Sequence, residues 1–269
     1  GYAMPWTQAP VEVYGVLELS ANYEAIDLSY DFDLTDDWSA SAQVQYGRAI
    51  GADTISNDLV ALNYSMTNGE LTLRAGYSRA DVAIVSGGSI EGVAALINPT
   101  ILASDKPGNA ATGSLEGTFA GLAAMYDNGT ILAIAEFTSL AVDSVFADQD
   151  GYYAMGGYRI GQWMPYLTYS SEETTDDSDR SLTAAPSGSL TALDIGTAQV
   201  ILASLNTEQT RTGLGVRYDL KPGVALKFQY DMVDTGDTGG EFDNGSNGLP
   251  SPPADGKANI MSFTIDTVF

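Results

Sequence analysis

The chain has 269 residues, with 35 acidic residues against 11 basic ones and a formal net charge of −24. This charge argues against a nucleic-acid partner, because phosphate backbones are bound by positively charged surfaces. The sequence contains no histidine and no cysteine, which excludes histidine-dependent catalytic triads, disulfide scaffolds and thiolate zinc sites, so we predict no enzymatic activity.

The first 21 residues show no regular periodicity. Pro5 and Pro10 argue against a strand or a helix over the first ten residues, because proline lacks an amide hydrogen and has a fixed φ. Val11–Leu19 fits either a short strand or an extended loop.

From Tyr23 onward the sequence alternates between apolar and polar residues, which is the period of a β-strand with two different faces. Ile26 and Leu28 share one parity, for example, and Asp27 lies on the other. Within the long loop after the eighth predicted strand, residues 189–205 are a candidate surface helix. The eleven predicted strands are 23–34, 38–48, 58–67, 70–79, 116–127, 130–140, 151–160, 164–171, 208–220, 224–234 and 257–269.

The connections between these strands alternate strictly between tight turns and longer loops. The tight turns all fall at one end of the predicted sheet, and the loops, rich in Asp, Ser, Gly and Thr, fall at the other. This asymmetry is typical of outer-membrane β-barrels and is not a rule of soluble sandwiches. No apolar run approaches the ~20 residues of a membrane helix. The tight turns are 36–37, 68–69, 128–129, 161–162 and 222–223.

Two stretches resemble a known family. Residues 1–15, GYAMPWTQAPVEVYG, followed by ANYEAIDLSYDF at 21–32, are similar to porins of marine gammaproteobacteria, in which such a stretch follows a further N-terminal portion. The last strand resembles the signal read by the barrel-assembly machinery, an end Phe269 preceded by alternate apolar residues, although Thr267 stands where a larger apolar residue is common. The resemblance implies the outer membrane of a Gram-negative bacterium and a homotrimer.

The predicted fold is therefore all-β, a single transmembrane antiparallel β-barrel domain over residues 1–269. Eleven strands are an odd number, whereas bacterial single-chain barrels have an even number. We expect a sixteen-stranded barrel in the full protein, with five strands before Gly1 and with residues 1–21 as an inward-folded loop that narrows the pore. The alternative is a twelve-stranded barrel with Val11–Leu19 as its first strand.

If the apolar parity faces lipid, the charged residues of the other parity line a water-filled lumen. Opposite charges across a lumen set up a field that biases ion passage; the alternative is that they pair with strand neighbours and only keep the lumen hydrated. Glu12 and Glu18 are the constriction candidates if residues 1–21 fold inward, and otherwise they lie on a twelfth strand. The remaining predicted pore-lining residues are Asp27, Asp31, Arg74, Glu136, Arg159, Arg211, Arg217, Lys227 and Asp231.

Aromatic residues gather near both ends of the predicted strands, as expected for belts at the depth of the lipid headgroups. A soluble sheet also uses tyrosine freely. Small outward residues such as Ala40 and Ala42 are candidates for a contact between protomers. The predicted membrane-interface aromatics are Tyr30, Trp38, Tyr64, Tyr158, Trp163, Tyr218 and Phe269.

Two loops, 172–179 and 234–245, are strongly acidic. Carboxylates interspersed with glycine and threonine supply the oxygen ligands that calcium prefers, although neither loop has the spacing of an EF-hand. Divalent cations at these loops would also bridge the protein to lipopolysaccharide. The simpler alternative is a solvated acidic loop. The weak calcium candidates are Asp234, Asp237, Glu241 and Asp243.

The function that these features predict is a porin, a channel for passive diffusion of small hydrophilic solutes and ions, with a mild preference for cations. It requires no cofactor. A different possibility is a smaller barrel that acts as an adhesin or phage receptor through its loops. A soluble secreted β-protein, such as a carbohydrate-binding module, fits the turn asymmetry less well.

Overall fold

A computed structural model of the chain describes residues 4–14, 22–50, 54–84, 115–143, 147–176, 206–236 and 256–268. These residues form eleven strands and one short helix, α1 (Val11–Tyr14). The strands are β1 (Asn22–Asp33), β2 (Ser39–Ile50), β3 (Thr54–Thr67), β4 (Leu71–Ile84), β5 (Leu115–Asp127), β6 (Ile131–Val142), β7 (Gln149–Tyr158), β8 (Trp163–Thr174), β9 (Glu208–Lys221), β10 (Val224–Asp234) and β11 (Lys257–Thr267).

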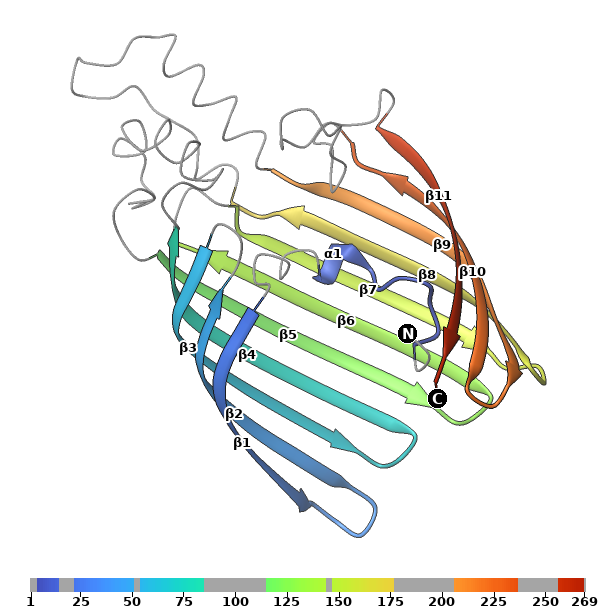
Figure 1. The fold of residues 1–269 in the computed structure, drawn as a ribbon, viewed down its shortest axis with the longest axis horizontal. Helices are drawn as coiled ribbons and strands as arrows, with labels where there is room; N and C mark the ends of the chain where they lie inside the picture. The colour runs from blue at the N-terminus through green and yellow to red at the C-terminus, as the bar shows by residue number, and fades with distance from the viewer. Residues whose placement is uncertain are drawn as a thin grey trace.

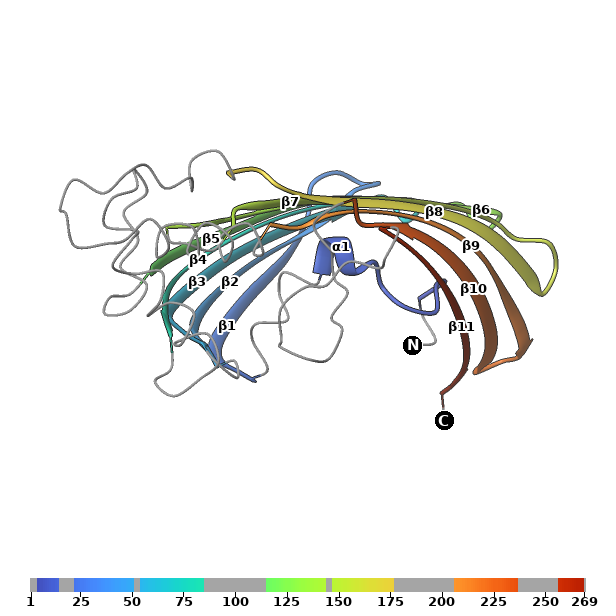
Figure 2. The ribbon, with the colours of Figure 1, turned by 90° about the horizontal axis from the view of Figure 1, so that it is seen from above.

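All eleven strands belong to one sheet, in which each strand pairs antiparallel with the next in sequence (Figure 1). The sheet curves into an open trough, and α1 lies within its concave side (Figure 2). Among the described strands, β1 and β11 are the two edges of the sheet. Eleven antiparallel strands were predicted from the alternation alone, and this prediction is confirmed.

The boundaries differ most at β3 and β4. The prediction placed a polar loop at residues 51–56, whereas β3 begins at Thr54, and β4 continues to Ile84. The register of β3 shifts between Asn57 and Val60, and Asp58 has a positive φ of 49°. This β-bulge inserts one residue and reverses the alternation, so a strict period-two pattern stops at the bulge although the strand does not.

A twelfth strand starting at Val11 is wrong for residues 11–14, which form the helical turn α1. The Val13 amide donates to the Pro10 carbonyl at 3.3 Å, and Pro10 itself has no amide hydrogen for a strand ladder. The rest of that predicted strand, and the candidate helix at 189–205, lie outside the described residues. Within the described part of the chain, no helix has the length and hydrophobicity needed to cross a membrane.

The five tight turns lie together at one end of the sheet, as predicted (Figure 1). The Asn68 side-chain oxygen accepts hydrogen bonds from the amides of Glu70 and Leu71, at 3.1 and 2.7 Å. Asn128 repeats this arrangement at the next tight turn, between β5 and β6. Gly69 and Gly129 follow with φ of 93° and 83°, a conformation that glycine adopts without steric penalty.

Two turn glycines differ in their surroundings, and this difference gives a testable prediction. A Cβ atom on Gly69 would meet open space, whereas one on Gly223 would lie 2.8 Å from the Val268 carbonyl oxygen at the end of β11. Gly69→Ala is expected to destabilise the protein by about 1–2 kcal/mol, the typical penalty for a left-handed residue. Gly223→Ala is expected to destabilise it more, because the end of β11 must also shift. Urea unfolding from lipid vesicles measures both, and equal midpoints would contradict the prediction.

Candidate functional site: the inner face of the sheet

The two faces of the sheet have opposite character. Residues 4–14 lie on the concave face, hereafter the inner face, where they cover side chains of β6, β7 and β8 (Figure 2). The convex, outer face exposes apolar side chains, including Ile26 (79% exposed) and Phe263 (64%). Directly paired residues of neighbouring strands point to the same side of a sheet. Residues 4–14 identify the inner-face residues of β7, and the pairing of neighbouring strands then identifies the inner-face residues of every other strand.

One row of paired residues shows the pattern of the inner face. Three of its members are Asp31, Arg74 and Glu136, so that charges of opposite sign alternate across the sheet. All of the predicted pore-lining residues in the described strands have the parity of this face. Following the register from β1 to β9, the row runs Asp31, Ser41, Ser65, Arg74, Ala123, Glu136, Tyr153, Ser170 and Arg211.

An apolar cluster attaches residues 4–14 to this face. Trp6 and Val13 are buried against the sheet. The ring of Trp6 meets that of Tyr153 edge to face, with centroids 5.7 Å apart and an interplanar angle of 82°, a favoured geometry for aromatic pairs. The other buried members of the cluster are Leu132, Met155, Met164 and Tyr166.

Glu12 of α1 forms the polar centre of the attachment. Its side chain is fully buried. Its two carboxylate oxygens accept hydrogen bonds from Ser170 at 2.9 Å, Gln209 at 2.6 Å and the Nε of Arg211 at 2.7 Å. A buried carboxylate is tolerated only when it is paired and hydrogen-bonded in this way. Arg211 also lies 4.0 Å from Asp231.

Side chains of β8, β9 and β10 hold the extended part of the segment. The Gln229 side-chain oxygen accepts from the Thr7 amide at 3.3 Å, the Thr7 hydroxyl at 3.2 Å and the Tyr166 hydroxyl at 2.9 Å. Lys227 donates to the Trp6 carbonyl at 3.2 Å and pairs with Asp266 at 2.7 Å. Main-chain and side-chain groups of residues 4–14 are thus bound to the same wall.

These contacts give the predicted pore-lining residues different environments. Glu12, expected at a constriction, has no exposed surface and serves as an anchor for the segment. Arg211, Lys227 and Asp231 are buried beneath the segment. Glu18 lies outside the described residues.

Arg217 and Arg159 are paired nearer to the tight turns. Arg217 donates to Asp219 through Nε at 2.9 Å and to the Met4 carbonyl at 3.2 Å. Arg159 makes a two-pronged contact with Asp127, at 2.5 and 2.8 Å. This hydrogen-bonded contact raises the pKa of Arg159, in the turn after β7, above its ordinary value.

The inner face of β1 to β5, together with Glu136 of β6, lies beside this covered wall, and most of its described side chains stay at least partly accessible. Asp27 accepts hydrogen bonds from Gln43 and, at 2.9 Å, from Gln45. Arg74 and Glu136 line a hollow of about 600 Å³ on this half. Its remaining inner-face lining consists largely of serine, amide, glycine and alanine side chains.

The structure describes six of the predicted interface aromatics. They lie on the outer face of the sheet near the tight turns, or in a tight turn itself. Trp163 and Tyr218 pack together there, with ring centroids 4.4 Å apart, and the Tyr218 hydroxyl donates to Gln162 at 3.1 Å. Tyr30 and Tyr158 are exposed. Phe269 lies outside the described residues.

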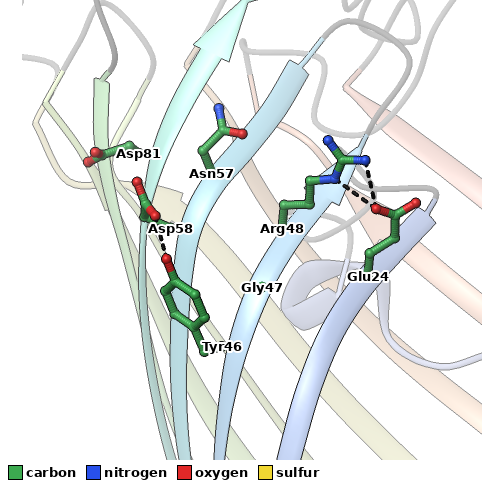
Figure 3. A pocket seen from close by; sticks show the side chains of 7 residues that line it. All are labelled: Glu24, Tyr46, Gly47, Arg48, Asn57, Asp58 and Asp81. Atoms are coloured by element: carbon green, nitrogen blue, oxygen red, sulfur yellow. Dashed lines mark hydrogen bonds and ion pairs between the residues drawn. The ribbon is translucent and has the colours of Figure 1, made fainter.

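At the opposite, long-loop end, the outer face becomes polar, as Figure 3 shows. Arg48 pairs with Glu24 at 2.7 Å, and the Tyr46 hydroxyl donates to Asp58 at 2.7 Å, with Asp81 close by. A charge on the lipid face is destabilising at the bilayer midplane by ~2–4 kcal/mol and by little near the interface. The charged residues therefore mark where the apolar band of the outer face ends.

The acidic loop after β10 is described only at its start and end. Asp234 accepts a hydrogen bond from the Gly236 amide at 3.1 Å and lies 3.7 Å from the ammonium of Lys257. Asp237, Glu241 and Asp243 lie outside the described residues, so the calcium hypothesis stays a prediction. Among the residues that the structure does describe, no group of three acidic side chains is arranged to hold a metal ion.

Sequence reasoning missed the apolar attachment surface on β7 and β8. Met155 and Tyr166 lie on the parity that is polar elsewhere. The signal was present, because β7 and the start of β8 carry apolar residues on both parities, as in Tyr152–Tyr153 and Met164–Leu167. Strands that are apolar on both faces are typically covered on both faces, and here residues 4–14 cover the inner one.

Comparisons with known proteins agree with this geometry. A family model described as Gram-negative porin matches residues 20–238. Two similar solved structures are an anion-selective porin from Comamonas acidovorans, with a TM-score of 0.52 and 12% identity, and the outer membrane channel DcaP of Acinetobacter baumannii, with 0.50 and 9%. Each alignment covers 90% of this chain, and they cover 59% and 62% of those two proteins. At these identities the likeness concerns the fold alone. No curated protein matches the chain.

Proposed function

Because this chain belongs to the family of Gram-negative porins, it is a protein of the bacterial outer membrane, and we propose that it forms the wall of a water-filled channel for small hydrophilic solutes and ions. The observation that carries the proposal is the division of one sheet into an exposed apolar outer face and a polar, charged inner face. Such a division fits lipid on one side and water on the other. Porins are channels and carry out no chemical reaction.

In this proposal, residues 4–14 narrow the channel by filling the inner face of β6 to β10. Solutes would pass along the accessible half, over β1 to β5. The buried contacts of Glu12 and Trp6 support a fixed position for the segment, because packing against the sheet buries both of these side chains completely or almost completely. The width of the passage would then depend on whether the segment stays attached.

We propose a mild preference for cations. Asp27, Asp31 and Asp33 share the inner parity of β1, and none of them forms an ion pair with another described residue. In a planar bilayer with a potassium chloride gradient, the reversal potential is expected to have the same sign as the equilibrium potential of potassium. Replacing the three aspartates with asparagine is expected to lower the ratio of potassium to chloride permeability toward one.

The matched control for this triple variant is Glu24→Gln, which removes a carboxylate from the outer face of the same strand. It is expected to leave the reversal potential unchanged. A reversal potential of the chloride sign in the unmodified protein would overturn the proposed preference. A protein that enters membranes but conducts no ions would overturn the channel itself and favour adhesion through the long loops.

Assembly and lipid contacts form part of the same proposal. We expect a homotrimer, with Ala40 and Ala42 at a contact between protomers, because small residues on a lipid-facing strand allow close approach. The last strand would be read by the barrel-assembly machinery. Lipopolysaccharide would contact the polar outer rim around Arg48 and Asp58, with bridging divalent cations at the acidic loops.

A further inference from the structure

Arg74 differs from every other arginine in the described residues. Arg48, Arg79, Arg159 and Arg211 each pair with a carboxylate, and so does Arg217. Arg74 makes no hydrogen bond or ion pair with any described residue, although it lies in a hollow of the inner face. A guanidinium with five donors in a fixed planar fork is suited to binding a carboxylate.

Glu136 lies across the hollow from Arg74. Arg74 pairs with Ala123, and Ala123 pairs in turn with Glu136. The two charged residues are therefore two strand spacings apart, which is about 10 Å. The residues between and beside them are small, with Ala123 on the same row and Gly76 paired with Gly121 on the next. On the row between the two opposite charges, the sheet therefore carries only the small side chain of Ala123.

The remaining wall of the hollow offers neutral hydrogen-bonding groups. The Asn63 amide donates to the Gln43 side-chain oxygen at 3.3 Å, and Gln43 donates to Asp27. Ser41 and Ser65 continue the row of Arg74 toward β1. Amide and hydroxyl groups of this kind suit the peptide bond of a small solute.

We propose that this hollow binds small zwitterionic solutes of the dipeptide class, with Arg74 on the carboxylate and Glu136 on the ammonium group. The inference rests on the proposed channel function, to which it adds a class of solute. An extended dipeptide spans about 7 Å between its charged ends, which fits between side chains on strands ~10 Å apart. A free anion would be opposed by the net charge of −24, whereas a zwitterion carries no net charge.

Titration calorimetry of the whole protein, purified in detergent from the outer membrane, tests the proposal. The probes are glycylglycine, N-acetylglycine, which lacks the ammonium group, and glycinamide, which lacks the carboxylate. Glycylglycine is expected to bind more tightly than either. Arg74→Gln and Glu136→Gln are each expected to weaken glycylglycine binding about tenfold, the typical effect of one charge-assisted hydrogen bond. Arg48→Gln, which removes an arginine of the outer face, is expected to have no effect.

The probes distinguish the possible outcomes. Equal binding of glycylglycine and N-acetylglycine, with no effect of Glu136→Gln, would show a simple anion site and overturn the proposal. Unchanged glycylglycine binding in both variants would also overturn it. If Arg74→Gln does not fold, Arg74→Lys keeps the charge and is expected to weaken binding several-fold through loss of the two-pronged contact. Bilayer conductance of the same sample tests the channel separately, so a conducting protein without zwitterion binding refutes only this inference.

Discussion

Replacing Arg211 with glutamine is expected to release residues 4–14 from the inner face of the sheet. The Glu12 carboxylate would keep Ser170 and Gln209 as hydrogen-bond donors but lose its only cation among the described residues. Removal of one partner from a buried ion pair typically destabilises by ~3–5 kcal/mol, because the other charge stays buried without compensation. Detachment relieves that penalty by returning Glu12 to water.

Trp6 reports the release directly. The protein has three tryptophans, so Trp38→Phe and Trp163→Phe leave Trp6 as the single tryptophan, which can be excited selectively over tyrosine. Trp6 is 6% exposed when the segment is attached. In Arg211→Gln its emission is expected to shift to longer wavelength, with several-fold stronger quenching by acrylamide. In a planar bilayer, the same variant is expected to have a larger single-channel conductance.

Two further variants control for the loss of charge. Arg48→Gln breaks an exposed pair, in which the side chains are 52% and 62% exposed. Such pairs contribute ~0–1 kcal/mol, so Trp6 should not respond. The double variant Glu12→Gln with Arg211→Gln leaves no unpaired carboxylate on the segment itself, although Asp231 still loses Arg211 as its neighbour at 4.0 Å. It is therefore expected to hold the segment better than Arg211→Gln alone. Trp6 emission that is the same in Arg211→Gln as in the unmodified protein would contradict the anchoring role of the ion pair.

Gly151→Ala is expected to displace the segment by a steric route. Gly151 lies on the inner face of β7, and a Cβ atom built on it would overlap the backbone carbonyl oxygen of Glu12. A backbone group cannot rotate away as a flexible side chain can, so α1 must move as a unit. Inserting a methyl group into a packed contact typically destabilises by ~1–3 kcal/mol.

The matched control lies on the same strand. A Cβ atom on Gly156, on the outer face of β7, would have no neighbour within 4 Å. Gly156→Ala is therefore expected to leave both the segment and the sheet unchanged. The acrylamide quenching of Trp6 compares the two variants. Equal quenching in the two variants would mean that residues 4–14 do not pack on Gly151. Circular dichroism spectra equal to that of the unmodified protein would establish that the sheet is folded in each variant.

The sequence predicts the sheet well where the alternation is strict. β1 and β2 keep apolar residues on one parity and polar residues on the other, so their ends are predicted to within two residues. Prediction fails where an additional residue or an additional contact breaks the pattern. The bulge at Asp58 hid the start of β3. Tyr166 and Met155 lie on the parity of the inner face although they are apolar, because residues 4–14 cover them.

By itself, the sequence determined the number of strands, their antiparallel order and the end at which the tight turns lie. These features depend on short-range causes, namely the alternation of side chains along a strand and the φ preference of glycine after asparagine. Only the tertiary structure decided which charges of the inner face are paired. Glu12 and Arg211 are 199 positions apart in sequence, and no local pattern links them. Their pairing depends on the packing of α1 against β7 and β8, which places the Glu12 side chain beside Arg211 of β9. Arg74 stays exposed on the other half of the sheet.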